Sequence, residues 1–450
     1  MACGCASVER PLPCEPIMTA DIAAIAVSAA IFIFTYVGIL MERVHRTLVV
    51  LVGAIVMLSL GTWLGFYSLD LAVEATDSNT ITLLFGMMVI VGLFQATGFF
   101  EYLAIAAAKL ARGKAWLLFI YLGLTTTVVS MFLDNVTTII LMIPVTMSLA
   151  DILDLPMTPF LVGEVMLSNI GGVATLIGDP PNILIGSAAH LSFTDFLVHL
   201  GPIVLLVWVF AQGLLLFMYR RTLWNAHTRS DGLAGMKARR ALTDPKTTQR
   251  MLTVLAATIV LFFCHEALRL ESGIVALIGA SAGLVWVWPD ARQALKAVHW
   301  DVLLFFVGLF VIVGGLESSG ALDVVAGAIS ALSAHGMVLA SLVVLWGSAL
   351  MSAVVDNVPF TIAMLPVLLA LQAQGVAVEP LWWALALGVG FGGNATPVGA
   401  TANVIAISAS EKAGQPLPTK TWLHKGIPMA LGTCLIASIL DVMAVYFGLF

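Results

Sequence analysis

The sequence predicts an all-α polytopic membrane protein made of two inverted repeats, each with five crossings, a re-entrant helical hairpin and a broken helix. Three observations predict this fold: the apolar composition, an internal repeat at a fixed offset, and the uneven placement of Lys and Arg. Of the 450 residues, 60% are hydrophobic and only 10% are charged, against roughly 25% charged in soluble domains. We therefore expect a lipid bilayer as the main partner. No basic stripe suggests nucleic acid.

Ten apolar stretches approach the roughly 20 residues that cross a ~30 Å hydrocarbon core. The predicted crossings are 20–41, 47–67, 80–97, 158–189, 197–219, 251–268, 273–288, 302–317, 381–409 and 428–448. Two further apolar segments, 115–150 and 337–372, are interrupted by Asp-Asn near their middles. Each of these two segments is predicted to enter and leave the membrane on one side, as a hairpin.

Positive charge orients the predicted spans. The loop 220–250 is rich in Lys and Arg, which predicts a cytoplasmic position. Successive spans cross the membrane in alternating directions, so this loop fixes the side of every other loop. Every Lys and Arg then lies inside except Arg10 and Arg269, while the acidic loop 68–80 lies outside. The layout predicts a multi-pass protein of the inner (plasma) membrane with both termini extracytoplasmic.

The same reading divides the chain into four parts. They are an N-terminal tail 1–19, a first transmembrane repeat 20–219, a basic cytoplasmic linker 220–250 and a second, inverted repeat 251–450. The tail holds Cys3, Cys5 and Cys14, a grouping compatible with a soft metal or metalloid but without a second ligand cluster. Met18 is an alternative start residue.

The two halves match residue by residue. An offset of 222 carries Asp134 to Asp356, Asn135 to Asn357 and Pro144 to Pro366, and several glycines follow the same shift. After one gap the offset is 221, which pairs Gly171 with Gly392, Thr175 with Thr396 and Asn182 with Asn403. Five crossings per half is an odd number, so the second half must run upside down. Inverted repeats place substrate and ion sites near the midplane, at broken helices.

The hairpin tips carry the first set of candidate site residues. Asp134, Asn135 and Thr137 lie at one tip, and Asp356 and Asn357 lie at the other. A carboxylate inside an apolar run is costly and marks a functional site. Asp also suits the N-cap of the returning helix. The two roles are compatible, because a capping carboxylate at mid-depth also offers oxygen to a cation.

Two Gly- and Pro-rich stretches carry the second set. The candidates are Asn169, Gly171, Thr175, Asp179 and Asn182 in the first half and Asn394, Thr396 and Asn403 in the second. Glycine and proline at this density cannot hold a continuous helix, and irregular backbone at membrane depth is tolerated where it is buried or lines a cavity. The freed carbonyls suit Na⁺ and the freed amides suit anions. A mere kink is the alternative.

Intramembrane charge bears on the substrate. Glu164 lies one turn before the first unwound stretch and is a possible proton carrier, although Leu385 occupies its repeat position. The acids have no Lys, Arg or His beside them at mid-depth in this layout, which favours cations, protons or neutral solutes over a dianion. No motif for nucleotide binding or catalysis is complete. We expect a transporter rather than an enzyme, with no cofactor or metal beyond the coupling ion, Na⁺ or H⁺.

The segments FLDNVTTIILMIPVT at 132–146 and SNIGGVATLIGDPPNILIG at 168–186 resemble the ion transporter superfamily. The likeness is to ArsB/NhaD-type permeases of the P-protein-like branch, which share a citrate-transporter-like domain. It implies a scaffold, an elevator-like transport domain and a homodimer. In the related dicarboxylate transporters the hairpin tips read Ser-Asn-Thr and bind Na⁺ and substrate carboxylate, whereas Asp134 and Asp356 occupy the Ser positions here.

The leading hypothesis is Na⁺/H⁺ antiport by an elevator-type mechanism, with a small ion as substrate. Asp134, Asn135, Asp356 and Asn357 would bind the ion, and a proton would compete for the same site. Proton-driven efflux of arsenite or a similar metalloid, and transport of an anion such as citrate or a dicarboxylate, are alternatives within the same class. An ion channel and a membrane aspartyl protease are alternatives of other classes. Stoichiometry, direction and oligomeric state do not follow from the residues.

Overall fold

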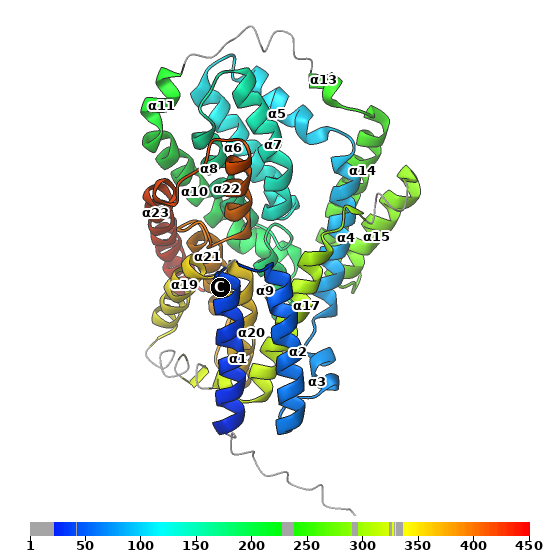
Figure 1. Ribbon diagram of the computed structural model, residues 1–450, viewed down its shortest axis with the longest axis vertical. Coiled ribbons are helices and arrows are strands. Elements are labelled where there is room, and N and C mark those ends of the chain that lie inside the picture. Colours follow the sequence, from blue (N-terminus) through cyan, green and yellow to red (C-terminus); the bar gives the residue numbers. More distant parts are fainter. Residues whose placement is uncertain are drawn as a thin grey trace, which may run out of the picture.

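The computed structural model describes residues 22–41, 43–226, 238–289, 296–323, 326–327, 329 and 336–450. All regular secondary structure in these residues is helical (Figure 1). The tail 1–19 with its three cysteines, and the part of the linker from 227 to 237, lie outside these residues. The statements below concern the described residues.

The described residues up to 226 contain eleven helices, α1 to α11. Their bounds are α1 (Ile22–Leu40), α2 (Arg46–Leu64), α3 (Leu69–Glu74), α4 (Ser78–Gln95), α5 (Phe99–Leu110), α6 (Ala115–Phe132), α7 (Asn135–Ile152), α8 (Met157–Gly172), α9 (Pro180–Ala188), α10 (Phe193–Met218) and α11 (Arg220–Asn225). The amphipathic α5 was not predicted, because at twelve residues it is too short for a crossing.

The second half repeats the order. Its helices are α13 (Ala238–Ala241), α14 (Pro245–Cys264), α15 (Ser272–Val287), α17 (Trp300–Ser318), α19 (Met337–Val354), α20 (Asn357–Ala373), α21 (Glu379–Gly392), α22 (Thr401–Lys412) and α23 (Thr419–Tyr446). Ten of the described helices are long and apolar enough to cross a membrane. Seven of these are predicted crossings, and three, α6, α7 and α19, are arms of the predicted hairpins. The predicted all-α fold with membrane spans is confirmed.

Both predicted hairpins are present, and each turns within two residues. After α6, Leu133 is extended and Asp134 caps α7 by accepting a hydrogen bond from the Thr137 amide at 2.9 Å. After α19, Val355 is extended and Asp356 caps α20. In Figure 1 the α6–α7 hairpin lies in the upper half of the molecule and α19–α20 in the lower half. The hairpins therefore approach the middle from opposite ends, as inverted repeats require.

The two predicted helix breaks are also present. The chain leaves helical geometry between α8 and α9 and again between α21 and α22. In the first break Gly172 and Gly178 approach so closely that a Cβ on either would lie 2.5 Å from the other's carbonyl oxygen. In the second break Gly393 and Gly399 make the same approach, at 2.8 and 2.6 Å. Only glycine permits this contact, so the spacing of these glycines specifies the fold of the break.

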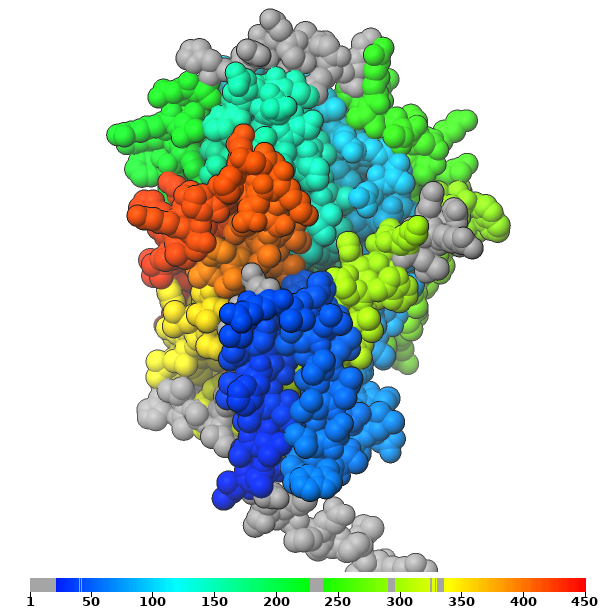
Figure 2. All heavy atoms as spheres, viewed as in Figure 1, coloured from blue at the N-terminus to red at the C-terminus, as the bar shows by residue number. Residues whose placement is uncertain are grey.

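The helices pack into two groups. We call α1, α2, α4, α14, α15 and α17 the scaffold, in which α2 packs on α17 and α4 packs on α15. We call α6 to α10 and α19 to α23 the hairpin unit, in which α6 packs on α8, α19 on α21 and α9 on α20. On the face seen in Figure 2, the N-terminal helices α1 and α2 lie beside the C-terminal segment that contains α22. The hairpin tips and helix breaks thus meet the scaffold.

Candidate functional site

Asp179 lies where the two repeats meet. It immediately precedes α9, and its side chain is only 1% exposed. The Asn135 Nδ2 group donates to its Oδ1 at 3.2 Å, and Asn357 Nδ2 donates to Oδ1 and Oδ2 at 3.2 and 3.4 Å. Asn135 and Asn357 begin α7 and α20, so amides from both hairpin tips converge on one buried carboxylate. No described Lys or Arg forms an ion pair with it.

A chain of buried asparagines continues from this carboxylate. Asn135 also donates to Asn169 Oδ1 at 3.1 Å. Asn169 in turn donates to Asn394 Oδ1 at 2.9 Å and to Asn403 Oδ1 at 3.0 Å. Asn169 comes from α8, whereas Asn394 and Asn403 come from the second break and α22. The structure therefore brings polar residues of both breaks and both tips into one connected network.

Asn182 and Asn403 hold the breaks open. Asn182 Nδ2 lies 3.0 Å from the Val173 carbonyl oxygen and 2.9 Å from that of Thr175. Asn403 Nδ2 donates to the Gly393 and Thr396 carbonyl oxygens, both at 2.8 Å. The repeat relation between Asn182 and Asn403 thus corresponds to one shared function. Both amides satisfy carbonyls that the interrupted helices leave without intrahelical partners.

The remaining candidates from the breaks have packing roles. The hydroxyl of Thr175 donates to the Met131 carbonyl, and that of Thr396 donates to the Ala353 carbonyl at 2.5 Å. Both hydroxyls therefore attach a break to the hairpin of its own repeat. Gly171 lies against Thr127 of α6, where a Cβ would come within 2.7 Å of the threonine side chain. These three residues shape the breaks through these contacts, and their role in ion binding stays a prediction.

Glu164 is separate from the network. It is 1% exposed, and its Oε1 accepts a hydrogen bond from Thr146 at 2.7 Å. Its Oε2 has no partner among the described residues. Glu164 and Asn169 are five positions apart on α8, or about 7–8 Å along the helix axis. Its role as a proton carrier stays a prediction.

The two repeat-related aspartates, Asp134 and Asp356, have different surroundings. Both oxygens of Asp134 accept from Thr137, through the amide at 2.9 Å and through the hydroxyl at 2.5 Å. Asp356 Oδ1 accepts from the Val358 amide at 3.2 Å, and its Oδ2 accepts from the Thr401 hydroxyl at 2.5 Å. The Asp356 Oδ2 also lies 3.3 Å from Arg46 Nη1.

Arg46 is the site residue that the sequence did not indicate. We expected no basic side chain beside the acids, and this expectation is wrong. Arg46 begins α2, and the distribution of Lys and Arg in the sequence predicted that it flanks the membrane on the cytoplasmic side. In the structure its guanidinium group also donates to Thr401 and lies over the Phe305 ring, 5.1 Å from the centroid. The long arginine side chain carries its charge inward, which a rule about loop position cannot detect.

At two pairs of repeat-related positions, one repeat has threonine where the other has proline. Thr137 corresponds to Pro359, and Pro180 corresponds to Thr401. Asp134 therefore receives a hydroxyl from its own helix, whereas Asp356 receives one from the helix after the opposite break. Proline lacks both a hydroxyl and an amide hydrogen. This difference was readable from the sequence and is the signal that could have identified Thr401.

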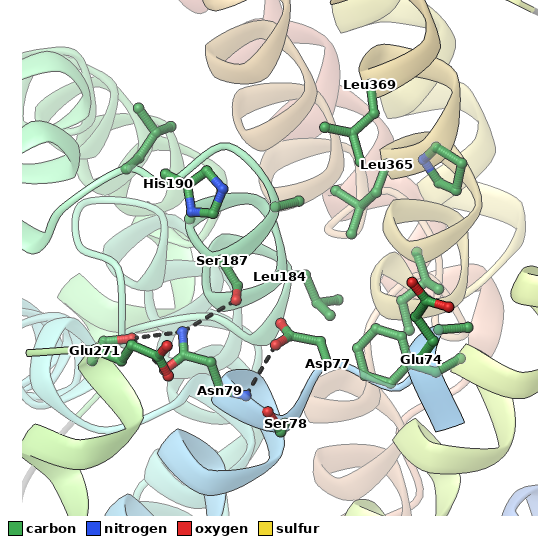
Figure 3. A pocket seen from close by; sticks show the side chains of 18 of the residues that line it. Glu74, Asp77, Ser78, Asn79, Leu184, Ser187, His190, Glu271, Leu365 and Leu369 are labelled. Atoms are coloured by element: carbon green, nitrogen blue, oxygen red, sulfur yellow. Dashed lines mark hydrogen bonds between the residues drawn. The ribbon is translucent and has the colours of Figure 1, made fainter. Parts of the chain in front are cut away.

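A cavity of about 690 Å³, which we call the vestibule, separates the scaffold from the hairpin unit on the predicted extracytoplasmic side. Figure 3 shows Asn79 of α4 directed at Ser187 of α9, with a hydrogen bond of 3.1 Å between Nδ2 and Oγ. The vestibule is lined by the carboxylates of Glu74, Asp77, Glu266, Glu271 and Glu317 and by one arginine, Arg269. The excess of carboxylates favours entry of cations over anions.

The vestibule ends short of the network. Its inner wall includes Leu184 and Ile362, each five residues beyond the start of the site at Asp179 and Asn357. This separation corresponds to about 7–8 Å of helix. A second cavity, of only about 30 Å³, lies between Arg46, Asp134, Thr137, Thr401 and apolar scaffold side chains. The vestibule is therefore the larger cavity but stops short of the network, whereas the small second cavity reaches Asp134 and Thr401.

The site has the ligand chemistry of a light cation. Within the described residues no three His, Cys, Asp or Glu side chains gather closely enough to hold a metal ion. Carboxylate and amide oxygens are present, however, and Asn135 Oδ1 is buried without a partner there. Hard oxygen ligands of this kind suit alkali and alkaline-earth cations rather than soft metals.

Fold and site together define a class: a helical, multi-pass membrane protein with inverted hairpin repeats. The chain belongs to the citrate transporter family, whose model matches residues 36–388. It is 38% identical over 419 residues to a protein named as an uncharacterized transporter of Mycobacterium bovis, covering 92% of this chain and 97% of that one.

Two further comparisons extend the relationship, one by sequence and one by structure. The human P protein is 32% identical over 497 residues, covering 92% of this chain and 59% of that protein. The crystal structure of the Alcanivorax borkumensis YdaH transporter, described as having an unusual topology, superposes with a TM-score of 0.59 at 14% identity. It covers 83% of this chain and 86% of that one. The predicted resemblance to P-protein-like permeases is confirmed.

Proposed function

We propose that this protein is a secondary transporter of the plasma membrane that exchanges Na⁺ for H⁺ at Asp179. One observation carries the proposal: a buried carboxylate with no cationic partner among the described residues is held between amides from both hairpin tips. A lone ionised carboxylate in this position is costly, so a bound cation or proton is strongly favoured. Competition between the two for one group gives exchange.

Two amide side chains give the site a means of changing ligand. With Nδ2 toward Asp179, Asn135 and Asn357 donate hydrogen bonds to the carboxylate. Rotation of either amide by half a turn presents Oδ1 instead, because the oxygen and nitrogen have nearly the same shape. A Na⁺ ion beside Asp179 would then have carboxylate and amide oxygens as ligands. Protonation of Asp179 removes the charge that holds Na⁺ and so favours its release.

The movement proposed is a displacement of the hairpin unit against the scaffold, the elevator-type mechanism that the resemblance implies. The Asp179 network lies within the hairpin unit, and polar contacts between this unit and the scaffold include Asn79 with Ser187 and Arg46 with Asp356. Few such contacts need to break for the unit to move. A homodimer, which the resemblance also implies, would hold the scaffolds fixed in the membrane.

Exchange is tested with the full chain in proteoliposomes that carry a pH gradient and an internal pH-sensitive dye. Adding Na⁺ should dissipate the gradient with the wild-type protein, and Asp179→Asn should reduce the rate to that of empty liposomes. Asp134→Asn should also lower the rate. Asp244→Asn, an exposed aspartate in the loop before α14, is the matched control and should retain it. A wild-type protein with no response to Na⁺ contradicts the proposal.

A carboxylate anion is the second candidate substrate. The family description names citrate, and Arg46 supplies a positive charge near the site that the sequence did not lead us to expect. The same liposomes loaded with labelled citrate distinguish the candidates. Citrate uptake without a Na⁺-driven proton flux favours the anion, arsenite flux favours metalloid efflux, and currents far above transporter turnover favour a channel.

A further inference from the structure

The repeat-related aspartates differ in whether a positive charge accompanies them. Asp356 has the Arg46 guanidinium 3.3 Å from Oδ2. Asp134 accepts hydrogen bonds from the neutral donors of Thr137, and it forms no ion pair within the described residues although Arg46 lines the same small cavity. In a perfectly symmetric molecule both carboxylates would have the same affinity for cations. The ion pair with Arg46 makes the affinity of Asp356 for a mobile cation different from that of Asp134.

Arg46 is held in place from the scaffold. It begins α2, its charge lies over the Phe305 ring of α17, and the neighbouring Thr47 hydroxyl donates to the Asp301 carbonyl oxygen of α17 at 3.0 Å. Its acceptors in the hairpin unit are Asp356, which caps α20, and Thr401, which begins α22. The arginine therefore brings a fixed charge across the boundary between the two groups of helices.

We infer that the Arg46 guanidinium group occupies the position at Asp356 where a second monovalent cation would otherwise bind. Arg46 thereby sets the number of mobile cations that the site binds. The inference rests on the proposed function. A guanidinium group that donates to a carboxylate and an adjacent hydroxyl satisfies the same oxygens that a hydrated or bound Na⁺ would. Mobile Na⁺ is then confined to Asp179 and the first repeat. Arg46 acts on selectivity and stoichiometry and does not itself contact the transported ion.

Equilibrium binding of radioactive Na⁺ to the purified full chain tests this inference. The wild type should bind about one Na⁺ per chain, and Arg46→Ala should bind about two, because the vacated carboxylate gains a mobile cation. Arg46→Lys, which keeps the charge, should behave as the wild type. Arg43→Ala removes an exposed arginine three residues earlier and should leave binding unchanged. An unaltered capacity in folded Arg46→Ala overturns the inference.

A second pair of variants keeps the test decisive if Arg46→Ala folds poorly. Asp356→Asn leaves Arg46 without its carboxylate, so its charge should weaken Na⁺ binding at the remaining site several-fold. Adding Arg46→Ala to Asp356→Asn should restore the wild-type affinity. A structural role alone would make the double variant worse than either single one, and that result would contradict the inference.

The failure of this inference and of the proposed function have different signatures. If the wild type neither binds nor exchanges Na⁺, the proposed function fails. Thermal unfolding then tests Arg46 alone: Arg46→Ala should lower the unfolding temperature of the wild type but not of Asp356→Asn. If the wild type exchanges Na⁺ while Arg46→Ala still binds about one Na⁺ per chain, only the inference about Arg46 fails.

Discussion

Asparagine side chains connect the two repeats at the level of single atoms. Asn169 is the central member, since its Nδ2 group is the donor for both Asn394 Oδ1 and Asn403 Oδ1. All three residues are buried. Water cannot replace a missing donor at such positions without a cavity to hold it, so the network is sensitive to the loss of any one member.

Replacing Asn169 with alanine should destabilise the protein. The change leaves two buried acceptors without a donor, and each such loss costs about 1–3 kcal/mol. A thermal unfolding series in detergent measures the effect as a lower midpoint temperature. Gln372→Ala removes an exposed amide from α20 and should leave the midpoint unchanged. Equal midpoints for both variants would mean that the network contributes nothing to stability.

The site was predictable from the sequence where a residue type and the repeat agreed. Asp134, Asp356 and their asparagines stood out because they recur at hairpin tips inside apolar runs. Asp179 was included among the candidates, but its central position could not be inferred, because its repeat partner is Ala400 and symmetry gave no support. Arg46 was missed because its sequence position indicates only where its backbone lies.

Helix breaks dominate the structure at the level of elements. Each one depends on glycines whose carbonyl oxygens approach the opposite Cα, as at Gly178, where a Cβ would lie 2.5 Å from the Gly172 oxygen and 2.7 Å from the Ser130 oxygen. Backbone atoms cannot move away as a flexible side chain can. The prediction of both breaks from Gly and Pro density succeeded for this steric reason.

Gly178→Ala and Gly399→Ala should each lower stability by about 1–3 kcal/mol, the usual range for overpacking. Gly347 of α19 has open space where a Cβ would be placed. Gly347→Ala should instead be neutral or stabilise by up to about 1 kcal/mol, because alanine restricts the unfolded chain and favours helix. Unfolding midpoints of the three variants provide the comparison, and a loss for Gly347→Ala as large as for Gly178→Ala would contradict it.

The start of α14 should depend on pH. Asp244 caps this helix, and hydrogen bonds from the Thr247 hydroxyl and amide hold its pKa below the ordinary value. A lowered pKa in the folded state means that the cap contributes fully above the ordinary carboxyl pKa and is lost as the pH falls through the lowered value. The protection of the Lys246 and Thr247 amides, measured against the intrinsic exchange rate at each pH, should therefore fall only under acid conditions, and Asp244→Ala should show low protection at every pH.

Inverted symmetry organises the whole molecule. The two hairpins, the two breaks and the two scaffold pairs, α2 with α17 and α15 with α4, all recur. The number and order of these elements followed from the fixed offset in the sequence. Their assembly into scaffold and hairpin unit did not, because lipid-facing and protein-facing apolar residues have the same composition in a membrane.

A cross-link between the two groups should stop transport. Asn79→Cys with Ser187→Cys, in a background without other cysteines, places two thiols where a 3.1 Å hydrogen bond now joins scaffold and hairpin unit. Oxidation should abolish exchange in proteoliposomes and a reductant should restore it, because the hairpin unit could no longer slide. Either single cysteine variant is the control. Continued exchange by the fully oxidised double variant would exclude movement at this boundary.

The unequal cavities have a consequence for the membrane potential. Water in the 690 Å³ vestibule carries the potential of the adjoining solution inward, so most of the transmembrane voltage falls across the short, dry region beyond it. A Na⁺ ion that moves from the vestibule to Asp179 crosses part of this dry region, and therefore part of the electric field. The voltage also acts on the displacement of the charged hairpin unit, and current measurements should divide the voltage dependence between ion entry and that displacement.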